Sequence, residues 1–115
     1  MERLEFLQGT LEILILRTLL FGPRHGYAIA QHIRQTSDEA LVVEAGSLYP
    51  ALQRLELQKL ITARWEIGES NRKTRVYRLT PAGRKRLDSS VSRWEEFVRA
   101  MGLVLRPAPD SARKE

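Results

Sequence analysis

The side chains able to do acid–base, nucleophilic or metal chemistry are few in this sequence. His25 and His32 are its only histidines, it has no cysteine, and it contains no glycine-rich phosphate loop. Two histidines seven residues apart with no cysteine nearby do not suit a metal site, so a capping or surface role is expected for both. Glu95 and Glu96 are adjacent, but neighbours on a helix point about 100° apart and cannot share a substrate. The sequence therefore predicts no enzyme, no metal and no cofactor.

Positive charge is the stronger chemical signal, and it is unevenly placed. The net charge is +5, from 19 basic and 14 acidic residues. One stretch of fifteen residues, 72–86, holds cations and no acidic side chain: Arg72, Lys73, Arg75, Arg78, Arg84, Lys85 and Arg86. Fixed positive charge of this kind suits a polyanionic partner such as the DNA backbone.

Length and composition predict one small cytoplasmic protein. A chain of 115 residues with 43% hydrophobic content builds a modest core, so burial of further surface in a dimer is expected. The first residues, Met-Glu-Arg-Leu-Glu, lack the basic-then-apolar order of a signal peptide. No apolar run approaches the roughly 18 residues of a membrane span, so no membrane partner is expected.

A helix over about residues 46–57 is the element best suited to position a DNA contact. Its apolar residues recur at spacings of four and three on one face: Leu48, Leu52 and Leu55. The opposite face carries Ser47, Pro50, Gln53 and Arg54. Ser47 is the expected N-cap and Pro50 the expected first-turn proline. By itself the pattern fits either a recognition helix or an ordinary amphipathic helix with a solvated face.

The segments before this helix are expected to form its support. Leader residues 1–9, with Leu4, Phe6 and Leu7, are expected to dock on the domain or on a second chain. A helix from an N-cap at Thr10, apolar around most of its circumference, is expected to be central to the core and to end at residues 21–23, Phe-Gly-Pro. A second helix is expected over about 26–35. A polar turn at 36–39 and a β-prone run at 41–43 follow.

The segments after it predict a hairpin and a long helix. Two strands are expected, at 61–67 and at 74–79, joined by a polar tip at 68–73. The period-two alternation of the first indicates a half-buried strand. Thr80 and Pro81 are the expected N-cap and first residue of a helix over 81–105. Its apolar residues form a heptad seam: Leu87, Val91, Trp94, Val98, Met101 and Leu105. This seam is expected to pack on a second copy; packing back on its own core is the alternative. Residues 106–115 are expected to be disordered.

The predicted fold is therefore mostly α with a small β-hairpin, an α+β winged helix-turn-helix. Residues 1–80 would form the DNA-binding domain, 81–105 a C-terminal dimerisation helix and 106–115 a tail. In this arrangement the third helix enters the major groove and the basic hairpin lies over the adjacent backbone or minor groove. From the residues alone, Ser47, Tyr49 and Arg54 are expected to contact the groove, and Arg72, Lys73 and Arg75 the phosphates.

Four segments resemble the PadR family of transcriptional regulators. They are Leu-Gln-Gly-Thr-Leu at 7–11, Gly-Pro-Arg-His-Gly-Tyr at 22–27, Gly-Ser-Leu-Tyr-Pro-Ala-Leu-Gln-Arg-Leu-Glu at 46–56 and Tyr-Arg-Leu-Thr-Pro-Ala-Gly at 77–83. The single C-terminal helix is similar to that of a compact subgroup of homodimeric repressors. The Glu-Ser-Asn-Arg-Lys wing at 69–73 is similar to a form common among regulators of efflux or permease genes. The resemblance implies a homodimer on a palindromic operator in double-stranded DNA.

The resemblance also implies site residues. It places Tyr27, Leu48 and Pro50 at the DNA face, whereas periodicity assigns Leu48 to the core. The family usually has glycine near the end of the third helix, and here Lys59 stands in its place. That departure argues against a left-handed C-cap and for a changed angle of the wing.

A small aromatic effector is a further expectation. In a multidrug-sensing branch of the family, a tryptophan from each C-terminal helix lines a pocket at the dimer centre, and Trp94 matches that place. Phe97, Met101 and Leu7 are the candidates to complete such a pocket. The alternative is that Trp94 only fills the heptad seam. For the whole protein, the alternative to DNA binding is a winged-helix protein-interaction module, which would favour an acidic or neutral wing and an apolar third helix.

Overall fold

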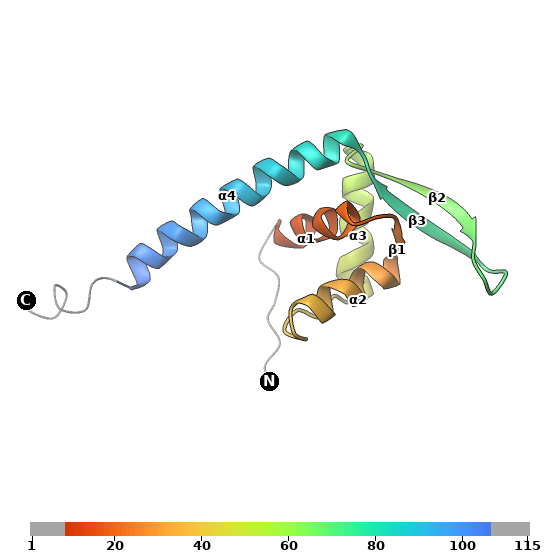
Figure 1. Ribbon diagram of the computed structural model, residues 1–115, viewed down its shortest axis with the longest axis horizontal. Helices are drawn as coiled ribbons and strands as arrows, with labels where there is room; N and C mark the ends of the chain where they lie inside the picture. Colours follow the sequence, from red (N-terminus) through yellow and green to blue (C-terminus); the bar gives the residue numbers. More distant parts are fainter. Residues whose placement is uncertain (1–8, 107–115) are drawn as a thin grey trace, which may run out of the picture.

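Helices and a small sheet alternate along the chain in the computed structural model, which describes residues 9–106 (Figure 1). The elements are α1 (Thr10–Leu20), β1 (Arg24–His25), α2 (Gly26–Thr36), α3 (Ala45–Leu57), β2 (Ile61–Ile67), β3 (Lys73–Leu79) and α4 (Pro81–Leu105). The expectations for the leader up to residue 8 and for the tail from residue 107 lie outside the described residues. The predicted winged helix-turn-helix is confirmed.

The wing is an antiparallel sheet with strand order β1-β3-β2. The hairpin pairs Ile61 with Leu79 at its base and Ile67 with Lys73 near its tip. The sequence did not predict β1, where Arg24 pairs with Tyr77 and His25 with Val76. Two residues are too few to show a period, so only the neighbouring strand reveals this one.

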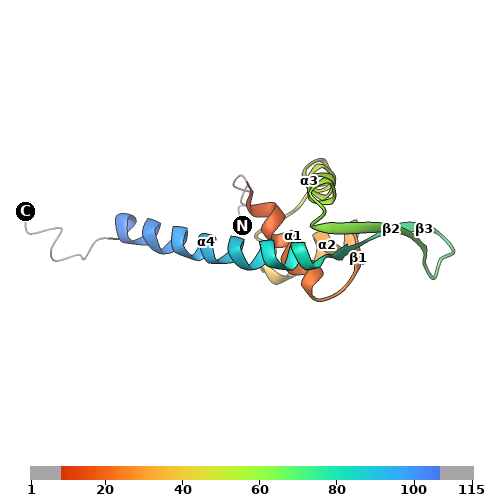
Figure 2. The same ribbon diagram turned by 90° about the horizontal axis from the view of Figure 1, so that it is seen from above.

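The core is built around α1, as its apolar circumference predicts. Ile15 is fully buried, and α1 contacts α2, α3, α4 and β3. The buried hydrophobic residues come from every helix and from the base of the wing: Leu11, Ile15, Leu16, Leu19, Ile29, Ile33, Leu48, Ala51, Leu52, Leu55, Leu60, Ile61, Tyr77 and Leu87. One layer of helices therefore carries α3 on one side and the hairpin at one end (Figures 1 and 2).

Two predicted N-caps are wrong. Gly9, with φ 84°, is the N-cap of α1, and Thr10 is its first helical residue. The carbonyl of Glu44 accepts from the amides of Ser47 and Leu48, so α3 begins at Ala45 and Ser47 lies inside its first turn. Pro50 consequently lies beyond that turn, where its missing N–H leaves an intrahelical bond unmade.

One β prediction also needs correction. The β-prone run 41–43 forms no strand, in keeping with the predicted element order, and its Leu41 and Val43 pack on the core from a loop. The alternation of β2 holds only near its base. Trp65 and Ile67 are 62% and 66% exposed, because the outer half of the hairpin extends past the helices (Figure 1).

The end of α3 forms a left-handed C-cap in spite of its lysine. Lys59 has φ 62°. Its amide donates to the carbonyl of Glu56 at 2.9 Å, and the amide of Leu60 donates to Leu55 at 3.0 Å. These two bonds define a Schellman motif. The expectation against a left-handed C-cap is therefore wrong: the backbone bonds offset the cost of about 1 kcal/mol that a left-handed lysine carries.

Candidate nucleic-acid interface

The outer face of α3 is polar and open. Ser47, Tyr49, Pro50, Gln53 and Arg54 are exposed there. Leu48 is 2% exposed and lies in the core, as periodicity predicts. The face that points away from the other helices (Figure 2) thus carries the side chains expected to enter a groove.

Two tyrosines lie at the start of α2, Tyr27 as its second residue and Tyr49 of α3 against Gly26. A β-carbon on Gly26 would lie 2.8 Å from the hydroxyl of Tyr49, so only a glycine lets this ring rest on the start of α2. Tyr27 is 66% exposed, and its ring stacks on that of His25, with centroids 6.5 Å apart. His25 caps α2 by accepting from the amide of Ala28 at 3.3 Å, which confirms its expected capping role. The structure therefore brings the predicted residues Tyr27 and Tyr49 to one place.

Arg54 is held by a residue that the sequence analysis missed. Its Nε donates to Oε2 of Glu12 at 2.7 Å. Glu12 belongs to α1, 42 residues away in the chain, and no local pattern connects the two positions. Within residues 9–106 only its Nε is engaged, so the two Nη groups are available to a base or a phosphate.

Four of the five cations of the wing fall into two groups; the fifth, Arg64 on β2, is exposed and forms no ion pair with a described residue. Arg72 and Lys73 are exposed at the tip, where neither forms an ion pair with any residue in 9–106. The tip is a turn in which the amide of Gly68 donates to the carbonyl of Arg72 at 3.0 Å. Arg75 and Arg78, closer to the helices, are bound to Glu56 and Glu66, each at 2.9 Å. Free charge is therefore greatest at the tip.

Arg75 sits among aromatic groups as well. Its guanidinium carbon lies 5.5 Å from the centroid of the Trp65 ring. Burial raises the pKa of Tyr77, and the positive charge of Arg75 opposes that rise. Beyond its base, the wing thus carries a small network that joins α3, β2 and β3.

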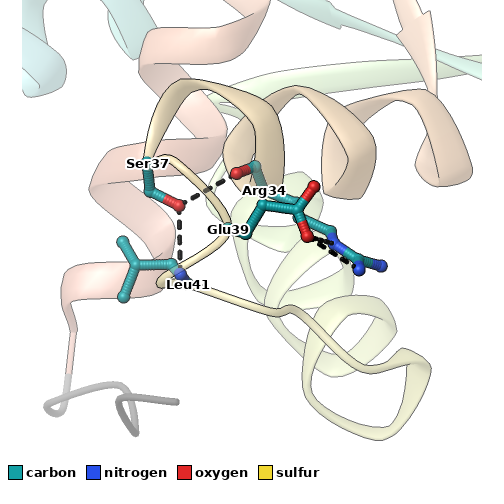
Figure 3. Close-up of polar contacts among 4 residues, drawn as sticks. All are labelled: Arg34, Ser37, Glu39 and Leu41. Atoms are coloured by element: carbon teal, nitrogen blue, oxygen red, sulfur yellow. Dashed lines mark hydrogen bonds and ion pairs between the residues drawn. The ribbon is translucent and has the colours of Figure 1, made fainter. Parts of the chain in front are cut away.

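The connection that leads into α3 is fixed by its own hydrogen bonds (Figure 3). The hydroxyl of Ser37 donates to the carbonyl of Arg34 at 3.2 Å and accepts from the amide of Leu41 at 3.0 Å. Arg34 donates to the Glu39 carboxylate from both Nε and Nη2. Asp38 and Glu39 both have positive φ, 54° and 68°. A polar turn was predicted here, but the pairing of Arg34 with Glu39 was not.

The helix α4 projects away from the other helices (Figure 1), so part of its heptad seam lies beyond the core. Leu87 is buried and Val91 packs on the core. Trp94, Val98, Met101 and Leu105, in contrast, are 38%, 48%, 43% and 67% exposed. The seam residues therefore divide into an inner pair that belongs to the core and an outer set of four, the outer seam.

A groove of about 390 Å³ lies between the start of α1 and the middle of α4. It is lined by Gly9, Thr10, Ile13, Ser90, Arg93, Trp94 and Phe97. The rings of Trp94 and Phe97 are 6.0 Å apart at 35°. The structure thus brings two of the expected effector-pocket residues together; Met101 does not line the groove, and Leu7 lies outside the described residues.

The fold agrees with comparison to known proteins. The model of the transcriptional regulator PadR-like family matches residues 15–89. The chain belongs to the PadR family. A transcriptional regulator of Mycobacterium tuberculosis is 34% identical over 95 residues, covering 83% of this chain and 85% of the relative.

Two solved PadR-like structures extend the agreement to three dimensions. A transcriptional regulator from Clostridium thermocellum is 32% identical with a TM-score of 0.76, covering 83% of this chain and 92% of its own. A PadR-family regulator from Eggerthella lenta is 32% identical with a TM-score of 0.74, covering 87% and 85%.

Membership of the PadR family places the chain among transcriptional regulators and not among enzymes, and implies DNA binding. Within residues 9–106, no helix has the length and apolar character needed to cross a membrane.

Proposed function

We propose that this PadR-family chain is a homodimeric repressor that binds a palindromic operator in double-stranded DNA. The observation that carries the proposal is the position of a polar α3 face beside a hairpin whose tip holds two cations, Arg72 and Lys73, without an ion-pair partner in the described chain. A helix in the major groove and a charged wing on the backbone would use both.

The proposed groove contacts are Ser47, Tyr49 and Pro50 near the start of α3, with Tyr27 beside them and Arg54 further along. The N-terminal part of a recognition helix is the part that reaches base edges. Arg72 and Lys73 are the proposed phosphate contacts. Arg75, expected from the sequence as a third phosphate contact, lies in the same wing and is bound to Glu56.

The outer seam supports the homodimer. Four apolar side chains at heptad spacing on a projecting helix leave a stripe that a second α4 would cover. Two-fold symmetry would then present two α3 helices to half-sites about 34 Å apart, one turn of DNA.

Removal of the tip cations tests the DNA contact. A variant with Arg72→Ala and Lys73→Ala is expected to bind the promoter region of its own gene more weakly than the wild type. Its affinity should also depend less steeply on salt, because each lost phosphate contact lowers the slope of log K against log salt by about one. Binding measured by fluorescence anisotropy at several salt concentrations gives that slope.

The control removes the same charge elsewhere: Arg99→Ala with Arg106→Ala, at the far end of α4, should keep the wild-type slope. An equal loss of slope in both variants would contradict a phosphate contact by the tip. Indifference of the wild type to DNA at low salt would favour the alternative, a protein-interaction module.

We also propose that the groove beside Trp94 takes a small aromatic effector. The neighbouring Trp94 and Phe97 rings, tilted by 35°, give a planar ligand two aromatic contacts, and Arg93 on the rim favours a neutral or anionic one. In a Trp65→Phe variant, where Trp94 is the remaining tryptophan, titration with 2-naphthoate is expected to change the fluorescence saturably. An unchanged emission would leave Trp94 as a seam residue only.

A further inference from the structure

Arg75 differs from the other wing cations in how its side chain is used. It lies on β3 directly opposite Trp65 on β2, and its guanidinium is held over that ring. Its Nη2 also donates to Oε2 of Glu56 in the last turn of α3. The Arg75 side chain, which comes from β3, therefore contacts Trp65 on β2 and Glu56 on α3.

The pair of Arg75 with Glu56 has a particular place in the fold. Among the described residues, no other ion pair joins the hairpin to a helix. The remaining polar ties are at the base, where Thr80 bonds to the carbonyls of Lys59 and Leu60. Arg75 thus fastens the hairpin to α3 at a point further toward the tip.

The charge of Glu56 argues against a simple phosphate contact by Arg75. A carboxylate on the DNA-facing helix repels phosphates, and it neutralises the arginine to which it is bound. Both side chains are 36% exposed. What the pair supplies is a fixed geometry, at the expense of net positive charge.

We propose that Arg75 is a positioning residue: bound to Glu56 and stacked on Trp65, it sets the angle between the wing and α3 and so the selectivity for one operator. This inference rests on the proposed DNA-binding function. A wing held at one angle reaches the backbone only when α3 is seated in the register that the operator allows, whereas a loose wing would contact any duplex.

Glu56→Gln is the discriminating variant. If Arg75 were a phosphate contact, removal of the neighbouring negative charge would strengthen binding to every duplex. If Arg75 positions the wing, affinity for the operator is expected to fall about three- to tenfold for the dimer, while affinity for a scrambled duplex stays the same or rises. The operator used is the tightest-binding duplex that the wild type selects from a randomised pool.

Arg75→Gln and the double variant complete the cycle. Each single variant is expected to lower the ratio of operator to scrambled affinity, and the double variant to lower it no further, because both break one contact. Independent, additive effects would overturn the proposal. Glu69→Gln is the matched control: it removes a wing carboxylate that forms no ion pair in the described chain, and it should leave the ratio unchanged.

A readout without DNA separates this inference from the function on which it rests. In a Trp94→Phe background, Trp65 reports the wing alone. Both Glu56→Gln and Arg75→Gln should lower its steady-state anisotropy, and an unchanged anisotropy would overturn the positioning role. If the wild type selects no duplex but the anisotropy of both variants falls, Arg75 still positions the wing and the DNA-binding proposal fails.

Discussion

A Gly83→Ala substitution is expected to lower the free energy of unfolding by about 3 kcal/mol. A β-carbon at Gly83 would overlap the backbone carbonyl of Leu60. Movement of that carbonyl would weaken two hydrogen bonds, because it accepts from the amide of Thr80 at 3.1 Å and from the Thr80 hydroxyl at 2.9 Å. Thr80 in turn caps α4 by accepting from the amide of Gly83. The added methyl group would therefore strain the corner where α3, β2 and α4 meet.

The measurement is urea unfolding of Gly83→Ala beside Gly102→Ala. Gly102 lies in the same helix with open space around it, so alanine there should raise the unfolding free energy by up to about 1 kcal/mol through helix propensity. The change from glycine to alanine is thus expected to lower the free energy of unfolding at position 83 and to raise it at position 102 of the same helix. Equal effects at the two positions would show that close packing at Leu60 does not govern the result.

A Val98→Asp substitution is expected to dissociate the proposed dimer and to reduce operator affinity by at least about a hundredfold. The carboxylate would fall in the middle of the outer seam, where burial between two helices is costly without a cation. A monomer loses the gain from binding two linked half-sites, which is of the order of 10²–10⁴. Light scattering after size-exclusion chromatography gives the mass, and anisotropy titration gives the affinity.

Ala100→Asp is the control for that experiment. Ala100 is exposed on α4 and lies about 200° around the helix from Val98, so the same charge there should leave both mass and affinity near the wild type. A dimeric Val98→Asp variant with unchanged affinity would mean that another surface holds the two copies together.

Features with a local cause were predictable from the sequence. Thr80 and Pro81 start α4 because the cap and the fixed φ of proline act within one turn, and the helix has the predicted bounds. The buried and open faces of α3 follow from the spacing of its leucines. The hairpin follows from two β-rich runs around a polar turn. These residues need no distant partner to adopt their conformation.

Features that depend on distant partners were not predictable. Glu12 and Arg54 meet only after α1 and α3 pack together, and β1 exists only because β3 passes beside it. Ser47 has the residue type of an N-cap, yet the helix starts two residues earlier at Ala45. Lys59 adopts a conformation that its side chain disfavours, since two backbone bonds at the end of α3 require it. Tertiary and backbone demands override residue type at each of these positions.

The direct junction between β3 and α4 has a mechanical consequence. A single residue, Thr80, separates the wing strand from the helix, and it is bonded on both sides. The 25 residues of α4 form a lever about 37 Å long. A rotation of about 5° at its far end therefore displaces the attached domain by about 3 Å, close to the rise of one base pair. In the proposed dimer, small angular changes at the outer seam would therefore change the separation between the two DNA-binding domains.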